Sequence, residues 1–187
     1  MDNLEIIDSY RNLLLTCIND LDLIAINQIS RIIIQASLEN KMIYIAGNGG
    51  SASTSSHFAV DIGVGSYRRG KGAKAISLTE NSSIITATSN DLSFEDAISE
   101  QIKLLATKGD ILILISASGN SKNLIKSVKT AAELGVVTIS LTGFNGGQLK
   151  NLTDYNLHFE TPIGEYGVVE DLHLMCCHML TNIFRNS

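Results

Sequence analysis

The stretch DILILISASGNSKN, residues 110–123, begins as an unbroken apolar run and ends in a turn rich in serine and glycine. A short apolar run bounded by turn residues is typical of a strand buried on both faces, as in parallel sheets. The turn leads into a segment with helical periodicity, 121–134. A strand followed by a turn and a helix is the repeating part of a βαβ unit, so this stretch predicts an α/β fold.

The same alternation recurs on both sides of this stretch. It indicates a mostly parallel sheet with both faces covered by helices. We therefore predict a three-layer α/β/α sandwich around a doubly wound five-stranded sheet, with ligands binding beyond the carboxyl ends of the strands. The predicted strands are 42–47, 73–79, 110–116, 136–143 and 155–161, and the predicted helices are about 51–64, 81–105, 121–134 and 167–185.

The N-terminal part of the chain differs from this pattern. Residues 4–38 carry apolar side chains at helical spacing and predict one or two helices. The segment has more apolar residues than a helix with one solvent-exposed face usually carries. We therefore expect the segment 1–38 to dock on the rest of the domain. Docking on a partner subunit is one explanation of the excess, and a deep intrachain groove is the other. The length of 187 residues suits a single domain over 1–187.

Composition excludes several classes of protein. The net charge of -5 disfavours nucleic acid as a partner, and the basic run at 68–71 is short enough to be a solvated loop. Three cysteines without a C-x-x-C pair suit a reducing cytoplasm rather than a disulfide framework. The acidic start MDNLEIIDSY predicts no signal peptide, and no apolar run reaches the roughly 20 residues of a membrane span. We expect a cytoplasmic protein that binds neither nucleic acid nor membrane.

Three predicted strands end in similar polar turns, at 47–51, 116–121 and 142–147. Each contains an Asn-Gly or Gly-Asn pair, and the first two add serines and run directly into a helix. Helix N-termini and serine hydroxyls suit an anion, and glycine allows its close approach. An ordinary βα turn with serine caps is the alternative for any single loop. No dinucleotide or P-loop motif is present, so a small phosphorylated metabolite is the expected ligand.

Two pairs of polar residues lie on the helices next to these turns. His57 and Asp61 are four apart, on one helical face, and Glu170 precedes His178 by eight residues. Two histidines with two carboxylates suit a divalent metal such as Zn²⁺, and the same groups suit proton transfer. For a single histidine in an apolar helix, a structural role is the alternative.

Four motifs together resemble a known family. AGNGGSASTSSHFAVDI, TSNDLSFED, ISASGNSKN and EDLHLMCCHML, in this order, are similar to the sedoheptulose 7-phosphate isomerases, or phosphoheptose isomerases, of the sugar isomerase (SIS) fold. The resemblance covers nearly the whole chain. It implies a homotetramer with shared active sites that interconverts a ketose and an aldose phosphate through an enediol-like intermediate.

The resemblance also implies roles for individual residues. His178 matches the catalytic histidine of the family and His57 its first zinc ligand, so Zn²⁺ is the expected cofactor. Residues expected to bind the sugar phosphate are Asn48, Gly49, Gly50, Ser51, Asn90, Asp91, Ser116, Ala117, Ser118 and Ser121.

Three positions depart from the family pattern. Asp61 stands where the family has a Glu that is both the base and a metal ligand, Glu170 stands where it has Gln, and Gly167 where it usually has Asp. The base has then moved to Glu170, or the site suits a different sugar phosphate, or the activity is lost. The catalytic candidates are accordingly Asp61, Glu170 and His178, and the metal-ligand candidates are His57, Asp61, Glu170 and His178, with Glu170 a substrate contact as well.

The expected function is an aldose–ketose isomerase that converts sedoheptulose 7-phosphate into D-glycero-D-manno-heptose 7-phosphate for surface-polysaccharide synthesis. One alternative is a protein of the same fold that binds a phosphosugar, or acts as an adaptor, without turnover. The family includes such a relative, which binds the replication initiator. The other alternative is an isomerase of another phosphosugar.

Overall fold

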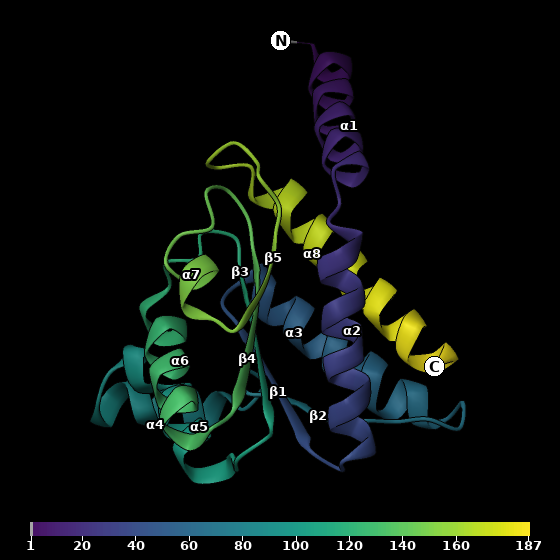
Figure 1. Cartoon of the computed structure of the whole chain (residues 1–187). Coiled ribbons are helices and arrows are strands. Elements are labelled where there is room, and N and C mark those ends of the chain that lie inside the picture. The colour runs from purple at the N-terminus through teal and green to yellow at the C-terminus, as the bar shows by residue number, and fades with distance from the viewer. Residues whose placement is uncertain (1) are drawn as a thin grey trace.

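A single parallel sheet of five strands forms the centre of the protein (Figure 1). The computed structural model describes residues 2–187. The strand order is β2-β1-β3-β4-β5, and each neighbouring pair is parallel, as the sequence predicts. The strands are β1 (Met42–Gly47), β2 (Lys74–Ser77), β3 (Ile111–Ser116), β4 (Val137–Thr142) and β5 (Tyr155–His158).

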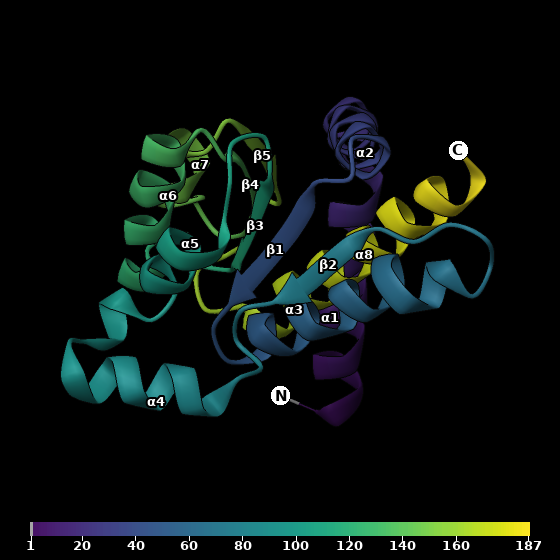
Figure 2. The same cartoon turned by 90° about the horizontal axis from the view of Figure 1, so that it is seen from below.

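Helices cover both faces of the sheet, which confirms the predicted three-layer α/β/α sandwich. The helices α2, α3 and α8 pack on one face, and α5, α6 and α7 pack on the other (Figure 2). The helices are α1 (Asn3–Asn19), α2 (Leu23–Leu38), α3 (Gly50–Val60), α4 (Ser82–Asp91), α5 (Ser99–Leu105), α6 (Lys122–Leu134), α7 (Leu149–Leu152) and α8 (Tyr166–Asn186).

The central strand β3 divides its side chains between the two cores. Ile111, Ile113 and Ile115 face α2, α3 and α8, whereas Leu112 and Leu114 face α5 and α6. All five are at most 1% exposed. Successive side chains of a strand point to opposite faces, so a run of five apolar residues in a strand must be covered on both sides.

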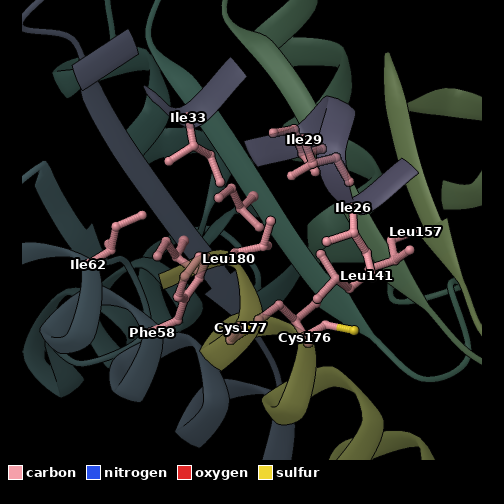
Figure 3. Packing of buried hydrophobic residues seen from close by; sticks show 14 of the residues in the cluster. Ile26, Ile29, Ile33, Phe58, Ile62, Leu141, Leu157, Cys176, Cys177 and Leu180 are labelled. Carbon is pink, nitrogen blue, oxygen red and sulfur yellow. The ribbon is translucent and has the colours of Figure 1, made fainter. Parts of the chain in front are cut away.

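The larger core lies between the sheet and the helices α2, α3 and α8 (Figure 3). Ile29 and Ile33 of α2 point toward the strands, and Phe58 of α3 packs beside Leu180 of α8. Cys176 and Cys177 of α8 are buried in this core and are free thiols. They are therefore small core residues, as the apolar run around them indicates.

Three features differ from the predicted elements. The predicted helix 81–105 is broken into α4, a short 3-10 turn at Phe94–Asp96, and α5, because Ser93 is extended and its hydroxyl bonds Asp96. The predicted helix 51–64 ends as a π-helix at Asp61–Gly65. The short helix α7 was not predicted. The broken segment leaves α4 projecting from the rest of the molecule (Figure 2), with none of its residues buried.

The first helix, α1, extends beyond the rest of the molecule (Figure 1) and exposes Leu4, Ile7 and Leu15. It contacts the start of α8 through Tyr10, whose hydroxyl donates to Asp171 at 2.5 Å. A Cβ at Gly167 would lie 3.3 Å from this hydroxyl, so the glycine leaves room for the tyrosine. Among residues 2–187 no single helix is long and apolar enough to cross a membrane. The helices α1 and α2 have the required length and apolar character only when taken together, and they are bent by 70° relative to each other.

The Tyr10–Asp171 contact predicts a pH dependence of the docking of α1. Partial burial, the hydrogen bond to Asp171 and the nearby carboxylates raise the pKa of Tyr10 from 10.0 to about 12. The stabilising contribution should be complete below pH 10, the unfolded value, and be lost as the pH rises to about 12. A titration that follows the ultraviolet absorbance of tyrosine phenolate should resolve one tyrosine that ionises at a higher pH than the others.

The variant Tyr10→Phe should remove that late component, and Asp171→Asn should lower its pKa by removing both the acceptor and its negative charge. A titration curve that is the same in Asp171→Asn and in the wild type would contradict the contact.

Candidate functional site

A cavity of about 350 Å³ opens at the carboxyl ends of β1 and β3. The chain crosses from β1 to β2 in one direction and from β3 to β5 in the other, so the cavity lies at the topological switch point, where the doubly wound fold predicts it. Its size falls within the range of small-molecule sites. It is lined by Asn48, Gly49, Gly50, Ser51, Ile115, Ser116, Ala117, Ser118, Ser121, Tyr166 and Glu170.

The first wall of the cavity is the turn from β1 into α3. A Cβ at Gly47 would lie 2.5 Å from the Ser51 carbonyl, so only glycine lets the helix begin this close to the strand. Gly49 has a φ of +56° and is the N-cap of α3, which has no side-chain cap. The first N–H groups of α3 therefore remain available to an anion.

The second wall is the serine turn after β3. The hydroxyl oxygens of Ser116 and Ser118 accept from the backbone N–H groups of Gly119 and Asn120, so their own protons remain free to donate. Ser121 is the N-cap of α6, but its side chain makes no capping bond. The alternative of a serine cap therefore does not hold for the side chain of Ser121, and its hydroxyl is available to a ligand in the cavity.

The third polar turn, at 142–147, supports the serine turn rather than lining the cavity. A Cβ at Gly119 would lie 1.9 Å from the Gly146 carbonyl, so the two turns pack backbone to backbone. Gly119 has a φ of +62°, which also favours glycine. The amide of Asn120 accepts from the Gln148 N–H and fixes the same contact.

Two residues that the sequence did not point to, Asn123 and Tyr166, also shape the cavity. The side chains of Asn48 and Asn123 exchange two hydrogen bonds, at 2.9 and 3.0 Å, and so join the first turn to the start of α6. Tyr166 lines the cavity from the first turn of α8. An isolated asparagine or tyrosine next to a turn carries no sequence signal, which explains why both were missed.

Glu170 reaches into the cavity from α8. The carboxylate lies against the start of α3, where a Cβ at Gly50 would come within 2.2 Å of Glu170 Oε2. Gly50 is therefore needed to admit this side chain. No lysine or arginine is among the described residues that line the cavity. The one charged group here is thus an anion, and the donors that the lining offers to an anionic ligand are hydroxyls and helix N-termini.

A separate cluster lies farther along the same two helices. The Nε2 atoms of His57 and His178 are 3.3 Å apart, and Asp61 Oδ2 is 3.5 Å from the first and 3.7 Å from the second. The two imidazoles are about half exposed, and the carboxylate is less so. The rings meet edge to face at 65°, so both nitrogens point to a common region with the carboxylate.

The donor set of this cluster fits a divalent metal. The three ligand atoms lie within 4.8 Å of one another. A tetrahedral Zn²⁺ with ligands at about 2.0–2.1 Å separates neighbouring ligand atoms by about 3.3 Å, which is close to the distances between these side chains. Three protein ligands on an exposed face leave a fourth position for a water or a substrate oxygen.

The remaining predicted site residues lie elsewhere. Glu170 is not part of the cluster, because its side chain points to Gly50. Asn90 and Asp91 lie exposed at the end of α4 and do not line the cavity; the Asn90 amide donates to the Asp91 carboxylate. Within one chain the structure therefore separates the predicted residues into a cavity, a cluster and an exposed pair.

A third histidine, His173, is a core residue. It is fully buried on α8, with its ring 5.6 Å from that of Phe159. Burial lowers its pKa to about 4, so the ring is neutral at pH 7. A structural role, the usual one for a histidine in an apolar helix, therefore fits His173.

Comparison with known proteins gives one family. A model of the SIS domain matches residues 7–143. The chain is 42% identical to a phosphoheptose isomerase of Helicobacter pylori (strain Shi470) over 146 residues, 77% of this chain and 74% of the relative. It is 37% identical to that of Aliarcobacter butzleri (strain RM4018) over 158 residues, 84% of this chain and 82% of the relative.

The solved structures agree with the sequence comparison. A phosphoheptose isomerase from Francisella tularensis superposes with a TM-score of 0.91 at 26% identity, and each chain is covered in full. One from Neisseria gonorrhoeae superposes with a TM-score of 0.88 at 27% identity, again over both whole chains. The likeness includes the C-terminal helix α8, which lies outside the matched domain model. The chain belongs to the SIS-domain family and, within it, to the phosphoheptose isomerases.

Proposed function

We propose that the protein is an aldose–ketose isomerase that converts sedoheptulose 7-phosphate into D-glycero-D-manno-heptose 7-phosphate. The names of its relatives support a phosphosugar isomerase. The proposal includes a single domain over 1–187, a cytoplasmic location and the supply of heptose for surface polysaccharide, which the family resemblance implies.

The distance between the cavity and the cluster is the observation that carries the proposal. The helices α3 and α8 both begin at the cavity, with Gly50 and Glu170, and both continue to the cluster, with His57 and His178. A helix rises about 1.5 Å per residue, so the two ends of the site are about 10 Å apart along α3 and about 12 Å apart along α8.

This span matches a seven-carbon sugar phosphate. With C–C bonds of about 1.5 Å, an extended chain puts its first two carbons about 9–10 Å from a phosphorus at C7. A substrate with its phosphate in the cavity can therefore present C1 and C2 near His57, Asp61 and His178. A shorter sugar phosphate would not reach both ends of this site.

The phosphate is held without a cation. Hydroxyls of Ser51, Ser116, Ser118 and Ser121 donate to its oxygens, and the N-termini of α3 and α6 add N–H groups and partial positive charge. Glu170 leaves its position against Gly50 when the anion binds, because two negative charges in one small cavity repel each other.

The reaction moves protons between C1 and C2. A carboxylate takes a proton from C1 of the ketose while O2 receives one, which gives the enediol. O1 then loses its proton and C2 gains one, so no atom is lost or added. Asp61 is the nearer candidate for the base, since it lies 3.7 Å from the imidazole of His178, which exchanges protons with the oxygens. Glu170 is the alternative base.

Zn²⁺ is part of the proposal, with His57, Asp61 and His178 as the residues that would hold it and Glu170 as a fourth once its side chain has left Gly50. His178 would act as an acid–base group only while its Nε2 is not bound to the ion, because a metal-bound nitrogen cannot take up a proton. When bound, the ion would polarise the two substrate oxygens and stabilise negative charge on the enediolate.

Turnover is the first prediction. Purified protein incubated with sedoheptulose 7-phosphate, with and without added Zn²⁺, should form the aldose phosphate, measured by NMR. The variant His178→Ala should lower kcat by about 100-fold or more, because it removes a general acid–base group. His158→Gln, at a histidine outside the cavity and the cluster, is the matched control.

The absence of turnover at high enzyme concentration under both conditions would contradict the proposal. Binding of the sugar phosphate without turnover would then favour the non-catalytic alternative, and turnover of a different phosphosugar would favour the other.

The two carboxylates give the second prediction. Asp61→Asn should lower kcat by about 100-fold or more, since it removes the base next to His178. Glu170→Gln should leave kcat within about tenfold and lower KM, because it removes a like charge from the phosphate cavity. Steady-state kinetics of the two variants decide which carboxylate is the base. A large loss of kcat in Glu170→Gln with a small one in Asp61→Asn would identify Glu170 as the base.

The oligomer gives the third prediction. The cluster is open to solvent, the pair Asn90 and Asp91 does not line the cavity at the ends of β1 and β3, and α1 exposes apolar side chains. A homotetramer in which the segment 1–38 docks on a partner subunit and Asn90 and Asp91 complete another subunit's site accounts for all three. Light scattering should give four times the chain mass of 20.2 kDa, and a monomer would contradict the shared site.

A further inference from the structure

The π-helix Asp61–Gly65 directly follows α3 and begins at a residue of the metal-type cluster. A π-turn inserts an extra residue into a helix, costs stability, and occurs frequently at functional sites. Here the carbonyl of Asp61 accepts from two side chains as well. The Ser66 hydroxyl donates to it at 2.7 Å, and Arg185 Nη2 donates to it at 3.1 Å.

Arg185 also bonds the serine that shares this carbonyl. Its Nε donates to Ser66 Oγ at 3.0 Å, and Ser66 is fully buried. The guanidinium and the hydroxyl therefore form a closed triangle with the Asp61 carbonyl. A Cβ at Gly65 would lie 3.1 Å from Arg185 Nη2, so the glycine leaves the space through which the arginine reaches the turn.

The triangle leaves the Asp61 carboxylate free. Both hydrogen bonds of Arg185 go to a carbonyl and a hydroxyl, and among the described residues the ion pairs of Asp61 are those with His57 and His178. Arg185 thus fixes the backbone at Asp61 without neutralising the side chain. An arginine paired with the carboxylate itself would compete with a metal or a proton for it.

Arg185 also connects the two helices of the cluster. It lies seven residues after His178 on α8, about 10 Å along the helix, whereas His57 and Asp61 belong to the other helix. A bond from the end of α8 to the π-turn therefore fixes how α3 and α8 lie relative to each other. The distance of 3.7 Å between His178 and Asp61 depends on that arrangement.

We propose that Arg185, acting through Ser66 and the π-turn, is a positioning residue for Asp61. It holds this carboxylate in reach of His57 and His178, both for binding a divalent cation and for proton transfer. The catalytic part of this inference rests on the proposed isomerase function, but the positioning of Asp61 does not. Positioning residues around a metal site typically contribute about 10–100-fold to affinity or activity.

The test compares Arg185→Met, which keeps the aliphatic stem and removes the donors, with Arg185→Lys, which keeps the charge and one donor group. Lys71→Met is the matched control, because the side chain of this exposed lysine contacts Ser187 near the end of α8, whereas its contact with Ser66 is through the backbone N–H, which the substitution keeps. Circular dichroism establishes that each variant is folded. If Arg185→Met does not fold, Ser66→Ala and Arg185→Lys take its place.

Three readouts are measured on each protein. In metal-free protein, the NMR shifts of the imidazoles of His57 and His178 should change in Arg185→Met and stay the same in Lys71→Met; the chain has four histidines, so single variants assign them. The dissociation constant of Zn²⁺, measured by calorimetry, should rise about 10–100-fold. With sedoheptulose 7-phosphate, kcat should fall by a similar factor while KM stays within about threefold, and Arg185→Lys should recover part of both losses.

Unchanged imidazole shifts in folded Arg185→Met would overturn the proposal, whether or not the protein turns over any substrate. If the wild type does not turn over sedoheptulose 7-phosphate but the imidazole shifts change in Arg185→Met as expected, the isomerase function is contradicted and the positioning role is still supported. An equal loss in Arg185→Met and Lys71→Met would attribute the effect to the end of α8 in general and also overturn the proposal.

Discussion

The packing of α3 against α8 is the constraint on which both ends of the site depend. The start of α3 is built from small residues, and its hydroxyls bond within the helix: Ser55 donates to the Ser51 carbonyl at 2.8 Å and Thr54 to that of Gly50. These hydroxyls therefore need no hydrogen-bond partner outside α3. Because the side chains are also small, α8 can pack closely against this helix. Because both helices begin at the cavity, one packing contact sets the distance from the phosphate end to the cluster.

The electrostatics of the cavity follow from the same geometry. A lysine or arginine would bind a phosphate more strongly, but the described lining contains neither. Hydroxyls and helix ends supply donors whose positions the backbone fixes, so they would hold the phosphate of the proposed substrate in one register along α3. Register matters here, because an isomerase has to bring two particular carbons of a long sugar to its acid–base groups. Glu170 adds a charge that discriminates by repulsion, since its carboxylate has to move before an anion can occupy the start of α3.

Much of this could be predicted from sequence because the signals are local. The unbroken apolar run of β3 and the recurring strand–turn–helix pattern determine the sheet, and the pairing of His57 with Asp61 follows from helical spacing. Other features depend on tertiary contacts. The Asn48–Asn123 pair joins residues 75 apart, and the π-turn continues a helical pattern without a break in the sequence. The spacing of eight residues places Glu170 and His178 on one helix, but it does not determine side-chain direction, so the placement of Glu170 over Gly50 was not predicted.

The reach of the Asp61 carboxylate depends partly on local helical spacing and partly on tertiary contacts. Asp61 has α-helical dihedral angles and lies before the extra residue of the π-turn, so its distance of 3.5 Å from His57 is set by ordinary spacing. Its distance from His178 is set by how α8 lies against α3. A side chain that is one methylene shorter than Glu can therefore reach the second histidine only if the two helices are held close there. The bonds of Arg185 to the Asp61 carbonyl and to Ser66 hold them at this point, since they connect the end of α8 to the backbone that carries the carboxylate.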